Sequence, residues 1–424
     1  MKYSELSKED LLKEFKNQEH KLAEFKAENL KLYLSRGKPS EEQLKLSLGL
    51  LDAVNSKSNT KYDNINCLNY GGLDGLSQMK QIFADMLNTS ADNIFAGGNS
   101  SLTIMFMVLN NLLINGTHGC KPWGEVKDRK FLCPVPGYDR HFQMTEHFGF
   151  KLIPVKMNSD GPDMDEIEEL IKNDESVKGV WCVPKYQNPT GIIFSDEVVE
   201  RFSKLKPKAK DFRIFWDNAY CLHNFNGNDK DIPDIISLCK ENGNEDMVYE
   251  FCSTSKITFP GAGVAALATG KNNLQEFKTY IKYATIGPDK INQLRHINYF
   301  KDINGVRAQM KKHAAILKEK FNAVYDILNS ELKDCGIADW TDVVGGYFIS
   351  FNVTGCSAKE LVGLCKDMGV VFTPAGATYP YGIDPTDSNI RLAPSFATKE
   401  DIKTSVSLLC AAAKYLSLKK LLNK

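Results

Sequence analysis

Between about residue 75 and residue 300, short apolar runs alternate with segments whose apolar spacing is helical. Each run is only a few residues long, which is typical of strands that are buried on both faces of a sheet. The alternation therefore predicts an α/β domain with a mostly parallel sheet. We expect strands at residues 130–133, 152–155, 179–183, 212–216 and 248–252, and helices that include residues 76–87 and 102–113.

The pattern changes after Pro288. A long stretch of helical spacing is followed there by single strands and shorter helices, which predicts a second, smaller α+β domain. We expect an N-terminal arm over residues 1–45 that joins the small domain, a large domain over 46–300 and a small domain over 301–424. In the small domain we expect helices at 302–332, 358–368 and from 399 onward, and strands at 345–351 and 389–392.

The N-terminal segment predicts a charged amphipathic helix. Residues 7–10 (Ser-Lys-Glu-Asp) resemble a capping box, and Leu11, Phe15, Leu22 and Phe25 fall near one face of the helix. This face could pack against a partner subunit or against its own domain, and the sequence leaves both alternatives open.

Charge and cysteine usage exclude several classes of function. The chain has 424 residues, of which 53 are basic and 53 acidic, so its formal net charge is zero. This balance argues against a surface dedicated to nucleic acid. The eleven cysteines show no Cys-x-x-Cys spacing and the seven histidines form no zinc-like cluster. We therefore expect reduced core cysteines and no metal site.

No segment has the character of a signal peptide or a membrane span. Residues 1–31 are rich in Lys and Glu and lack an apolar core. Apolar runs elsewhere are too short to cross a bilayer. We expect a soluble, cytoplasmic protein without a membrane partner.

Three motifs stand in order at the ends of expected strands. They are Asn-Pro-Thr-Gly at 188–191, Asp-Asn-Ala-Tyr at 217–220 and Ser-Thr-Ser-Lys at 253–256. An ionised Asp217 behind a buried strand needs a cationic partner, because the isolated burial of a carboxylate is costly. Lys256 offers an amine nucleophile. Each motif alone is weak, but the ordered set indicates a site that holds pyridoxal phosphate and uses it as an electron sink.

From about Leu34 to Phe396 the chain resembles the fold-type I pyridoxal-phosphate aminotransferases, of the class I/II superfamily. This resemblance implies a large cofactor-binding domain on a mostly parallel, seven-stranded sheet, with a smaller α+β domain. Several segments look like one bacterial aspartate aminotransferase subgroup. They are residues 34–39 (Leu-Ser-Arg-Gly-Lys-Pro), 136–142 (Pro-Gly-Tyr-Asp-Arg-His-Phe), 255–259 (Ser-Lys-Ile-Thr-Phe), 286–290 (Ile-Gly-Pro-Asp-Lys) and 375–380 (Ala-Gly-Ala-Thr-Tyr-Pro).

The resemblance implies a role for each residue of the motifs. Lys256 would bind the cofactor as a Schiff base and later carry the proton between substrate and cofactor. Asp217 would pair with the protonated pyridine nitrogen, with His141 hydrogen-bonded behind it. A core histidine with no such role is the alternative for His141. Tyr220 and Asn188 would hydrogen-bond the 3′-oxygen, and Tyr138 would stack on the pyridine ring.

The phosphate would lie at a glycine-containing turn before a helix. Glycine allows close backbone approach, and a helix N-terminus offers unpaired N–H groups to an anion. An ordinary helix cap is the alternative for this turn. The expected phosphate-binding residues are Gly98, Asn99, Ser100, Ser253 and Ser255, with Tyr70 of the partner subunit, so the resemblance implies a homodimer with shared active sites.

One departure from the superfamily concerns the phosphate. Many relatives carry an arginine seven or eight residues after the lysine, where this chain has Gly263 and Val264. The aspartate aminotransferase subgroup shares this departure, and the sequence does not identify a substitute for that charge.

Substrate binding is implied by three residues: Gly37, Asn188 and Arg391. Arg391 matches the arginine that forks onto the substrate α-carboxylate, a geometry that lysine cannot reproduce. Gly37 matches a backbone contact to the same group. Four cations are candidates for a distal carboxylate, by charge and neighbourhood only: Arg36, Arg140, Lys290 and Arg295.

The resulting prediction is an enzyme of amino-acid metabolism, an aminotransferase that transaminates aspartate with 2-oxoglutarate by ping-pong chemistry. Another amino acid as substrate, or a β- or γ-elimination, would use the same fold. A non-catalytic regulator or a silent homologue is disfavoured, since the motif set is intact and no helix-turn-helix pattern precedes it.

Overall fold

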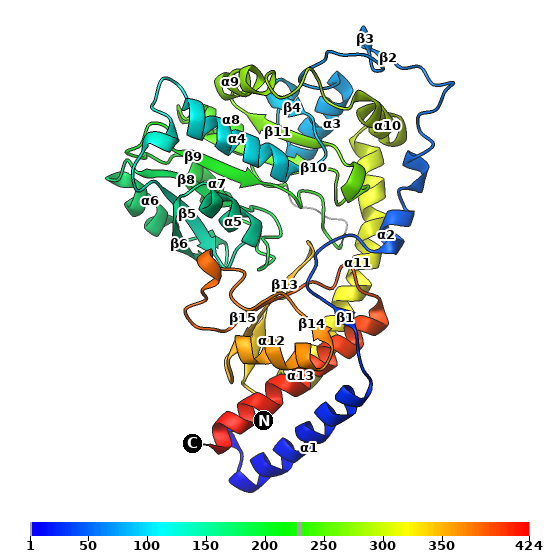
Figure 1. The fold of residues 1–424 in the computed structure, drawn as a ribbon, viewed down its shortest axis with the longest axis vertical. Coiled ribbons are helices and arrows are strands. Elements are labelled where there is room, and N and C mark those ends of the chain that lie inside the picture. Colours follow the sequence, from blue (N-terminus) through cyan, green and yellow to red (C-terminus); the bar gives the residue numbers. More distant parts are fainter. Residues whose placement is uncertain (1, 227–230, 424) are drawn as a thin grey trace.

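The computed structural model describes residues 2–226 and 231–423. Its larger part is built on a sheet of eight strands among the described residues (Figure 1). They are β4 (Ile94–Ala96), β5 (Lys130–Val135), β6 (Lys151–Asn158), β7 (Gly161–Pro162), β8 (Val177–Cys182), β9 (Arg213–Asp217), β10 (Val248–Ser253) and β11 (Ala265–Thr269). Neighbours in the sheet follow the order β4-β11-β10-β9-β8-β5-β6-β7.

The centre of this sheet is parallel, as the alternation of runs and helices predicts. The pairs β10–β9, β9–β8, β8–β5 and β5–β6 are parallel, whereas β11 is antiparallel to both β10 and β4. All five expected runs are strands of this sheet. The short β7, antiparallel to β6, adds an eighth strand to the seven expected.

Helices cover both faces of the sheet, because alternate side chains of each central strand point to opposite sides. One face packs against α3 (Ser77–Leu87), α6 (Met164–Lys172), α7 (Asp196–Ser203), α8 (Ile235–Glu241) and α10 (Lys290–Phe300). The other face packs against α4 (Ser101–Asn115), α5 (Asp139–His147) and α9 (Lys271–Ile281).

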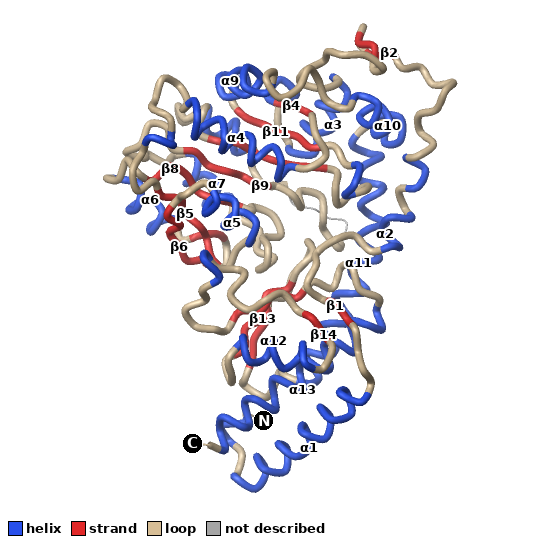
Figure 2. The backbone as a smooth tube through the Cα atoms, in the orientation of Figure 1, coloured by secondary structure: helices blue, strands red, loops and turns tan. Residues whose placement is uncertain are grey.

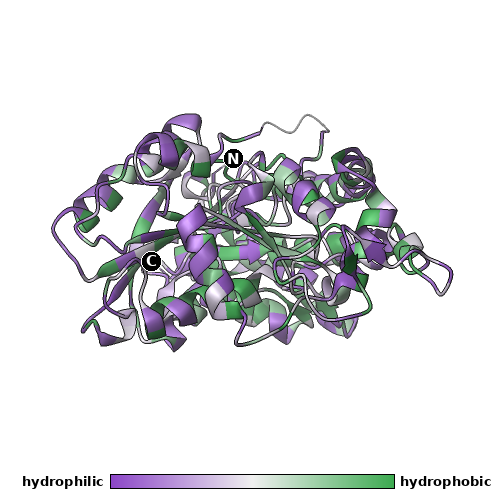
Figure 3. Ribbon diagram, turned by 90° about the horizontal axis from the view of Figure 1, so that it is seen from above, coloured by the Kyte–Doolittle hydropathy of each residue, from purple (hydrophilic) through white to green (hydrophobic). Residues whose placement is uncertain are grey.

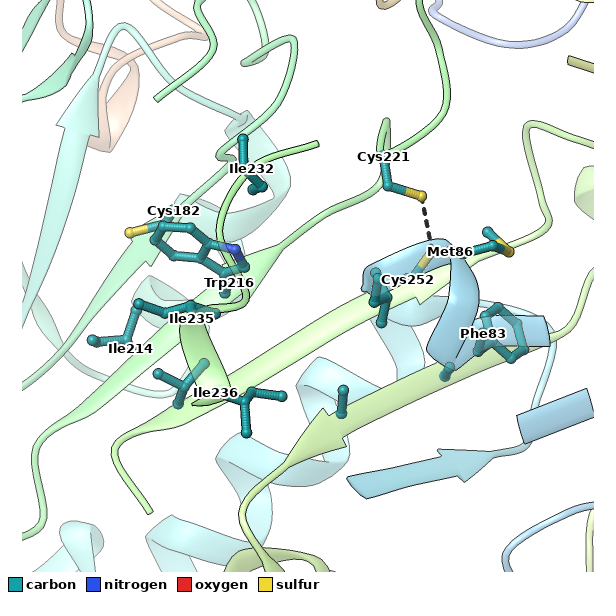
Figure 4. Packing of buried hydrophobic residues seen from close by; sticks show 14 of the residues in the cluster. Phe83, Met86, Cys182, Ile214, Trp216, Cys221, Ile232, Ile235, Ile236 and Cys252 are labelled. Atoms are coloured by element: carbon teal, nitrogen blue, oxygen red, sulfur yellow. Dashed lines mark hydrogen bonds between the residues drawn. The ribbon is translucent and has the colours of Figure 1, made fainter. Parts of the chain in front are cut away.

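Strand β9 illustrates this division. Ile214 and Trp216 belong to the first cluster and Phe215 to the second. Figure 4 shows Trp216 with Ile214, Ile235 and Ile236 around it. Seen from above, many residues of the strands in the middle of the molecule are hydrophobic, coloured green (Figure 3). The sheet is therefore a rigid two-sided core that holds the loops at its strand ends.

The smaller part has its own antiparallel sheet (Figure 2). It also has its own hydrophobic cluster. Its strands are β12 (Ala338–Trp340), β13 (Ile349–Val353) and β15 (Asn389–Leu392), covered by α12 (Ala358–Asp367) and α13 (Lys399–Leu422). Helix α11 (Ile303–Glu331) runs from the larger part into the smaller one (Figure 1). The domain boundaries given above stay a prediction.

The expected strand at 345–351 begins later than predicted, at Ile349. Gly345 and Gly346 precede it against the Tyr186 ring, and Gly346 has a φ of +83°. A Cβ on either residue would lie under 3 Å from a Tyr186 atom. The two glycines therefore allow a close approach of the backbone to an aromatic ring rather than extending the strand.

The N-terminal helix packs on its own chain. Helix α1 (Lys8–Ala27) lies along α13, where the Phe15 and Tyr415 rings stack with centroids 4.9 Å apart (Figure 1). The Ser7 side chain accepts a hydrogen bond from the Asp10 N–H and caps the helix, as expected. Strand β1 (Leu32–Tyr33) then pairs in parallel with β14 (Val370–Val371). Of the two alternatives, the face of α1 is used within the chain.

None of the described helices is long and apolar enough to cross a membrane.

Candidate active site

The predicted site residues gather at the carboxyl ends of the central strands. Asp217 is the last residue of β9 and Ser253 the last of β10, while the loop with Asn188 follows β8. Adjacent parallel strands end at the same edge of a sheet, where α/β proteins bind their ligands. Lys256 follows three residues after β10, so the three sequence motifs meet at one edge.

Asp217 is held from one side by a histidine. Nε2 of His141 lies 3.0 Å from Oδ2 of Asp217, and both side chains are buried. The His141 ring stacks on Trp181 at 4.1 Å and meets Tyr138 edge-on at 4.9 Å. The predicted contact behind Asp217 is thus present. Oδ1 of Asp217 is buried and has no hydrogen-bond partner, so this carboxylate is incomplete without a further donor.

The Lys256 amine lies near an aromatic ring, with no acid paired to it among the described residues. Its Nζ lies 4.7 Å from the centroid of the Tyr220 ring. Burial, with a smaller contribution from the Asp217 charge, raises the pKa of Tyr220. Burial raises the pKa of Tyr138 to about 12, and the Lys256 charge opposes that rise. Both phenols are therefore neutral hydrogen-bond donors at neutral pH.

An open turn lies between β4 and α4. Gly98 has a φ of +71°, and a Cβ there would meet open space. The Ser100 side chain does not cap α4, so it leaves the first N–H groups of the helix to another acceptor. Ser255 Oγ donates to the Asn99 carbonyl at 3.0 Å, and Ser253 Oγ lies 3.1 Å from Ser255 Oγ. The five residues expected around a phosphate are therefore together.

Arg391 belongs to β15 of the smaller part and lies near this edge of the large sheet. Part of its guanidinium is already hydrogen-bonded within the chain. Nη1 donates to Asp139 Oδ1 at 2.8 Å and to Asn188 Oδ1 at 3.3 Å. The guanidinium carbon lies 4.9 Å from the centroid of the Phe348 ring, and Nε is buried without a partner. Gly37 packs against Phe348, where a Cβ would come within 2.1 Å of the ring. The structure thus brings Arg391, Asn188 and Gly37 together.

Three further residues lie near the site residues and received no role from the sequence. Asp139 lies within the quoted segment 136–142 and Phe348 within the expected strand at 345–351, but only the fold shows that they flank Arg391. Glu250, in the middle of β10, is buried, and burial raises the pKa of its carboxyl to about 8. Asn218 Nδ2 donates to Glu250 Oε1 at 3.0 Å. An acidic residue inside an apolar run was the signal available for Glu250.

The four candidate cations lie in different places. Arg140 donates to the exposed Gln143, and Lys290 donates to the Gly71 carbonyl at 2.8 Å. Arg36 is exposed, whereas Arg295 lines a cavity beside Gly98. Tyr70 is 80% exposed and follows the short hairpin of β2 (Lys61–Tyr62) and β3 (Ile65–Asn66). Its side chain is therefore not buried in the site of its own chain.

Known proteins resemble this chain along nearly its whole length. The family model described as aspartate amino-transferase matches residues 6–424. An aspartate aminotransferase of Corynebacterium glutamicum is 45% identical over 403 residues, which is 93% of each chain. The crystal structure of an aspartate transaminase from the same species superposes with a TM-score of 0.96, at 42% identity over 99% of each chain.

A more distant structure shows the same fold. The α-aminoadipate aminotransferase of Thermus thermophilus, solved with N-(5′-phosphopyridoxyl)-L-leucine, has a TM-score of 0.74 at 20% identity, and the match covers 95% of each chain.

Proposed function

The chain belongs to the aspartate aminotransferase family and is an enzyme that transfers amino groups; we propose that it uses pyridoxal 5′-phosphate to transaminate aspartate with 2-oxoglutarate. The observation that carries the proposal is the buried Oδ1 of Asp217, which has no hydrogen-bond partner at the edge where Lys256 and Arg391 also meet. A carboxylate oxygen in such a place requires a donor. A protonated pyridine nitrogen is a donor that also carries the compensating charge.

The residues around Asp217 fit the rest of this cofactor. Tyr138, at the start of α5, would face the ring, and Tyr220 and Asn188 would donate to its 3′-oxygen. Gly98, Asn99 and Ser100, with the hydroxyls of Ser253 and Ser255, would hold the phosphate at the N-terminus of α4. Backbone N–H groups and the helix dipole favour an anion there.

The division of labour follows from these positions. When bound, the cofactor supplies an electron sink for the charge left on the substrate α-carbon. Lys256 Nζ would hold the cofactor and, once released, would move the proton from the substrate α-carbon to the cofactor, because a released amine stays within hydrogen-bond reach of both. Asp217, oriented by His141, would keep the pyridine nitrogen protonated. The amino group stays on the enzyme between two half-reactions, which gives ping-pong kinetics.

Arg391 would bind the α-carboxylate of the substrate. Its Nη1 is occupied by Asp139 and Asn188, so Nε and Nη2 form the pair of parallel donors that remains. Two parallel N–H groups match a carboxylate. The Phe348 ring and Gly37 limit the space around this pair, which favours one orientation of the substrate.

We further propose a homodimer with shared active sites, in which Tyr70 reaches the phosphate of the partner subunit. The exposed apolar side chains of Leu68, Tyr70, Tyr283 and Ile286 support an interface. All eleven cysteines are unpaired, which supports a reducing compartment, the cytoplasm.

The visible spectrum of the purified protein with added pyridoxal phosphate tests the function. A bound-cofactor band that aspartate removes and 2-oxoglutarate restores is the expected result. A band that responds to another amino acid would change the substrate, and release of a 2-oxo acid with the band intact would indicate elimination. Absence of a band from wild-type protein would overturn the proposal, with Lys256→Ala as the reference for unspecific binding.

A further inference from the structure

A cavity of about 280 Å³ lies beside the turn that precedes α4. Gly98 and Asn99 line it on one side, and the turn at Gly263 lines it on another. Asn292 and Arg295 of helix α10 also line it. The cavity therefore joins the open N-terminus of α4 to one cationic side chain.

Arg295 has no partner for its charge. It forms no ion pair and no hydrogen bond with any residue that the structure describes, and its Nε is buried. Asp289 also lines the cavity, but its carboxylate accepts from the Asn292 N–H at 2.9 Å and caps α10. A half-buried guanidinium with an unsatisfied N–H points to an anionic ligand from outside the chain.

The position of Arg295 is fixed through its own helix. Asn292, one turn earlier on α10, donates to the Ala262 and Gly263 carbonyls at 3.0 Å each. A Cβ on Gly263 would lie 3.0 Å from Ser255 Oγ and 3.2 Å from the Asn99 carbonyl. Helix α10, which carries Arg295, is thus hydrogen-bonded to the turn at Gly263. That turn packs against Ser255 and Asn99, two of the residues expected around the phosphate.

The neighbouring positions cannot supply the charge themselves. Gly263 has no side chain and too little room for one without movement of Ser255. Val264 is buried in the hydrophobic cluster on the face of the large sheet that α3 and α10 cover. The hydroxyls and N–H groups around Gly98 offer only dipoles, which leaves a dianionic ligand without a neutralising charge.

We propose that Arg295 is the cationic partner of the cofactor phosphate. This inference rests on the proposed function, because it assumes that the phosphate lies at the N-terminus of α4. It assigns Arg295 to cofactor binding and removes it from the candidates for the distal carboxylate of the substrate.

The test compares the affinities of apoprotein for pyridoxal phosphate and for pyridoxal, which lacks the phosphate. Arg295→Gln is expected to weaken pyridoxal phosphate binding about ten- to a hundredfold, the effect of a lost charged hydrogen bond, and to leave pyridoxal binding unchanged. Arg295→Lys should fall between wild type and Arg295→Gln, since lysine keeps the charge but not the fork. Inorganic phosphate should compete with pyridoxal phosphate in wild type and less in Arg295→Gln.

Arg201→Gln is the matched control, because Arg201 pairs with Asp165 and Glu168 on α6 and does not line this cavity. An equal loss for both ligands, or no loss for pyridoxal phosphate, would overturn the inference. If Arg295→Gln has normal cofactor affinity but a raised KM for aspartate, the inference is also overturned. Arg295 would then be a substrate-binding residue, and the proposed function would stand. If wild-type protein binds neither ligand, the proposed function itself fails. If Arg295→Gln does not fold, Arg295→Lys gives the same comparison.

Discussion

The Tyr347 hydroxyl donates to the backbone carbonyl of Lys256 at 3.4 Å, although the two residues are far apart in the chain. The same hydroxyl accepts from Gln43 Nε2 at 3.1 Å, and that nitrogen lies 2.9 Å from His313 Nδ1. Tyr347, Gln43 and His313 are all buried. This polar contact ties the backbone of the proposed catalytic lysine to the N-terminal segment and to α11.

Tyr347→Phe is expected to destabilise the protein by about 1–3 kcal/mol, because it removes the acceptor of one N–H of the buried Gln43 amide, whose nitrogen then keeps only the contact with His313. The free energy of unfolding in urea, measured without cofactor, is the readout. Tyr33→Phe is the control, since Tyr33 is 60% exposed in β1. Equal stabilities for the two variants would show that the contact contributes nothing.

Glu250→Gln should change how stability depends on pH. Burial raises the pKa of Glu250 from 4.5 to about 8 in the folded protein. The folded state therefore holds a proton that the unfolded state releases, so the Glu250 contribution to stability falls as pH rises from about 4.5 and reaches its minimum above about 8.

The glutamine variant keeps a group that accepts from Asn218 but cannot ionise. Its unfolding free energy should therefore fall less than that of wild type between pH 5 and about 8. Glu19→Gln, at an exposed site on α1, should follow the wild-type curve. Parallel curves for Glu250→Gln and wild type would mean that Glu250 does not titrate in this range.

Asp217→Asn tests the proposed pairing with the pyridine nitrogen. The amide retains the shape of the side chain and removes its charge, so it no longer favours a protonated ring. Cofactor affinity and kcat should both fall, by about tenfold or more. His141→Asn should give a smaller fall of the same kind, because it removes only the orienting contact at 3.0 Å. Unchanged cofactor affinity in Asp217→Asn would contradict the pairing.

Local patterns predicted the central strands and the order of the motifs, because bulky apolar runs and the residues directly after them need no tertiary information. Strand β11 was not predicted, since Ala265, Ala266 and Ala268 favour helix and form a strand only between β10 and β4. The pairing of Asp139 with Arg391 and the placement of Arg295 depend on segments remote in sequence, and no spacing rule brings such segments together.

Arg391→Lys should raise the KM for both aspartate and 2-oxoglutarate, by about ten- to a hundredfold, because both substrates carry the α-carboxylate and lysine cannot replace two parallel donors. In the structure Nη1 is held by Asp139 and Asn188, so a lysine that keeps the Asp139 contact has no second nitrogen left for the substrate. Cofactor affinity should stay at the wild-type value, which separates this effect from that of Arg295. Steady-state kinetics with each substrate varied provide the measurement, with Arg201→Lys as control because Arg201 pairs with Asp165 and Glu168 on α6 and has no role in the site. A normal KM for both substrates would exclude Arg391 from carboxylate binding.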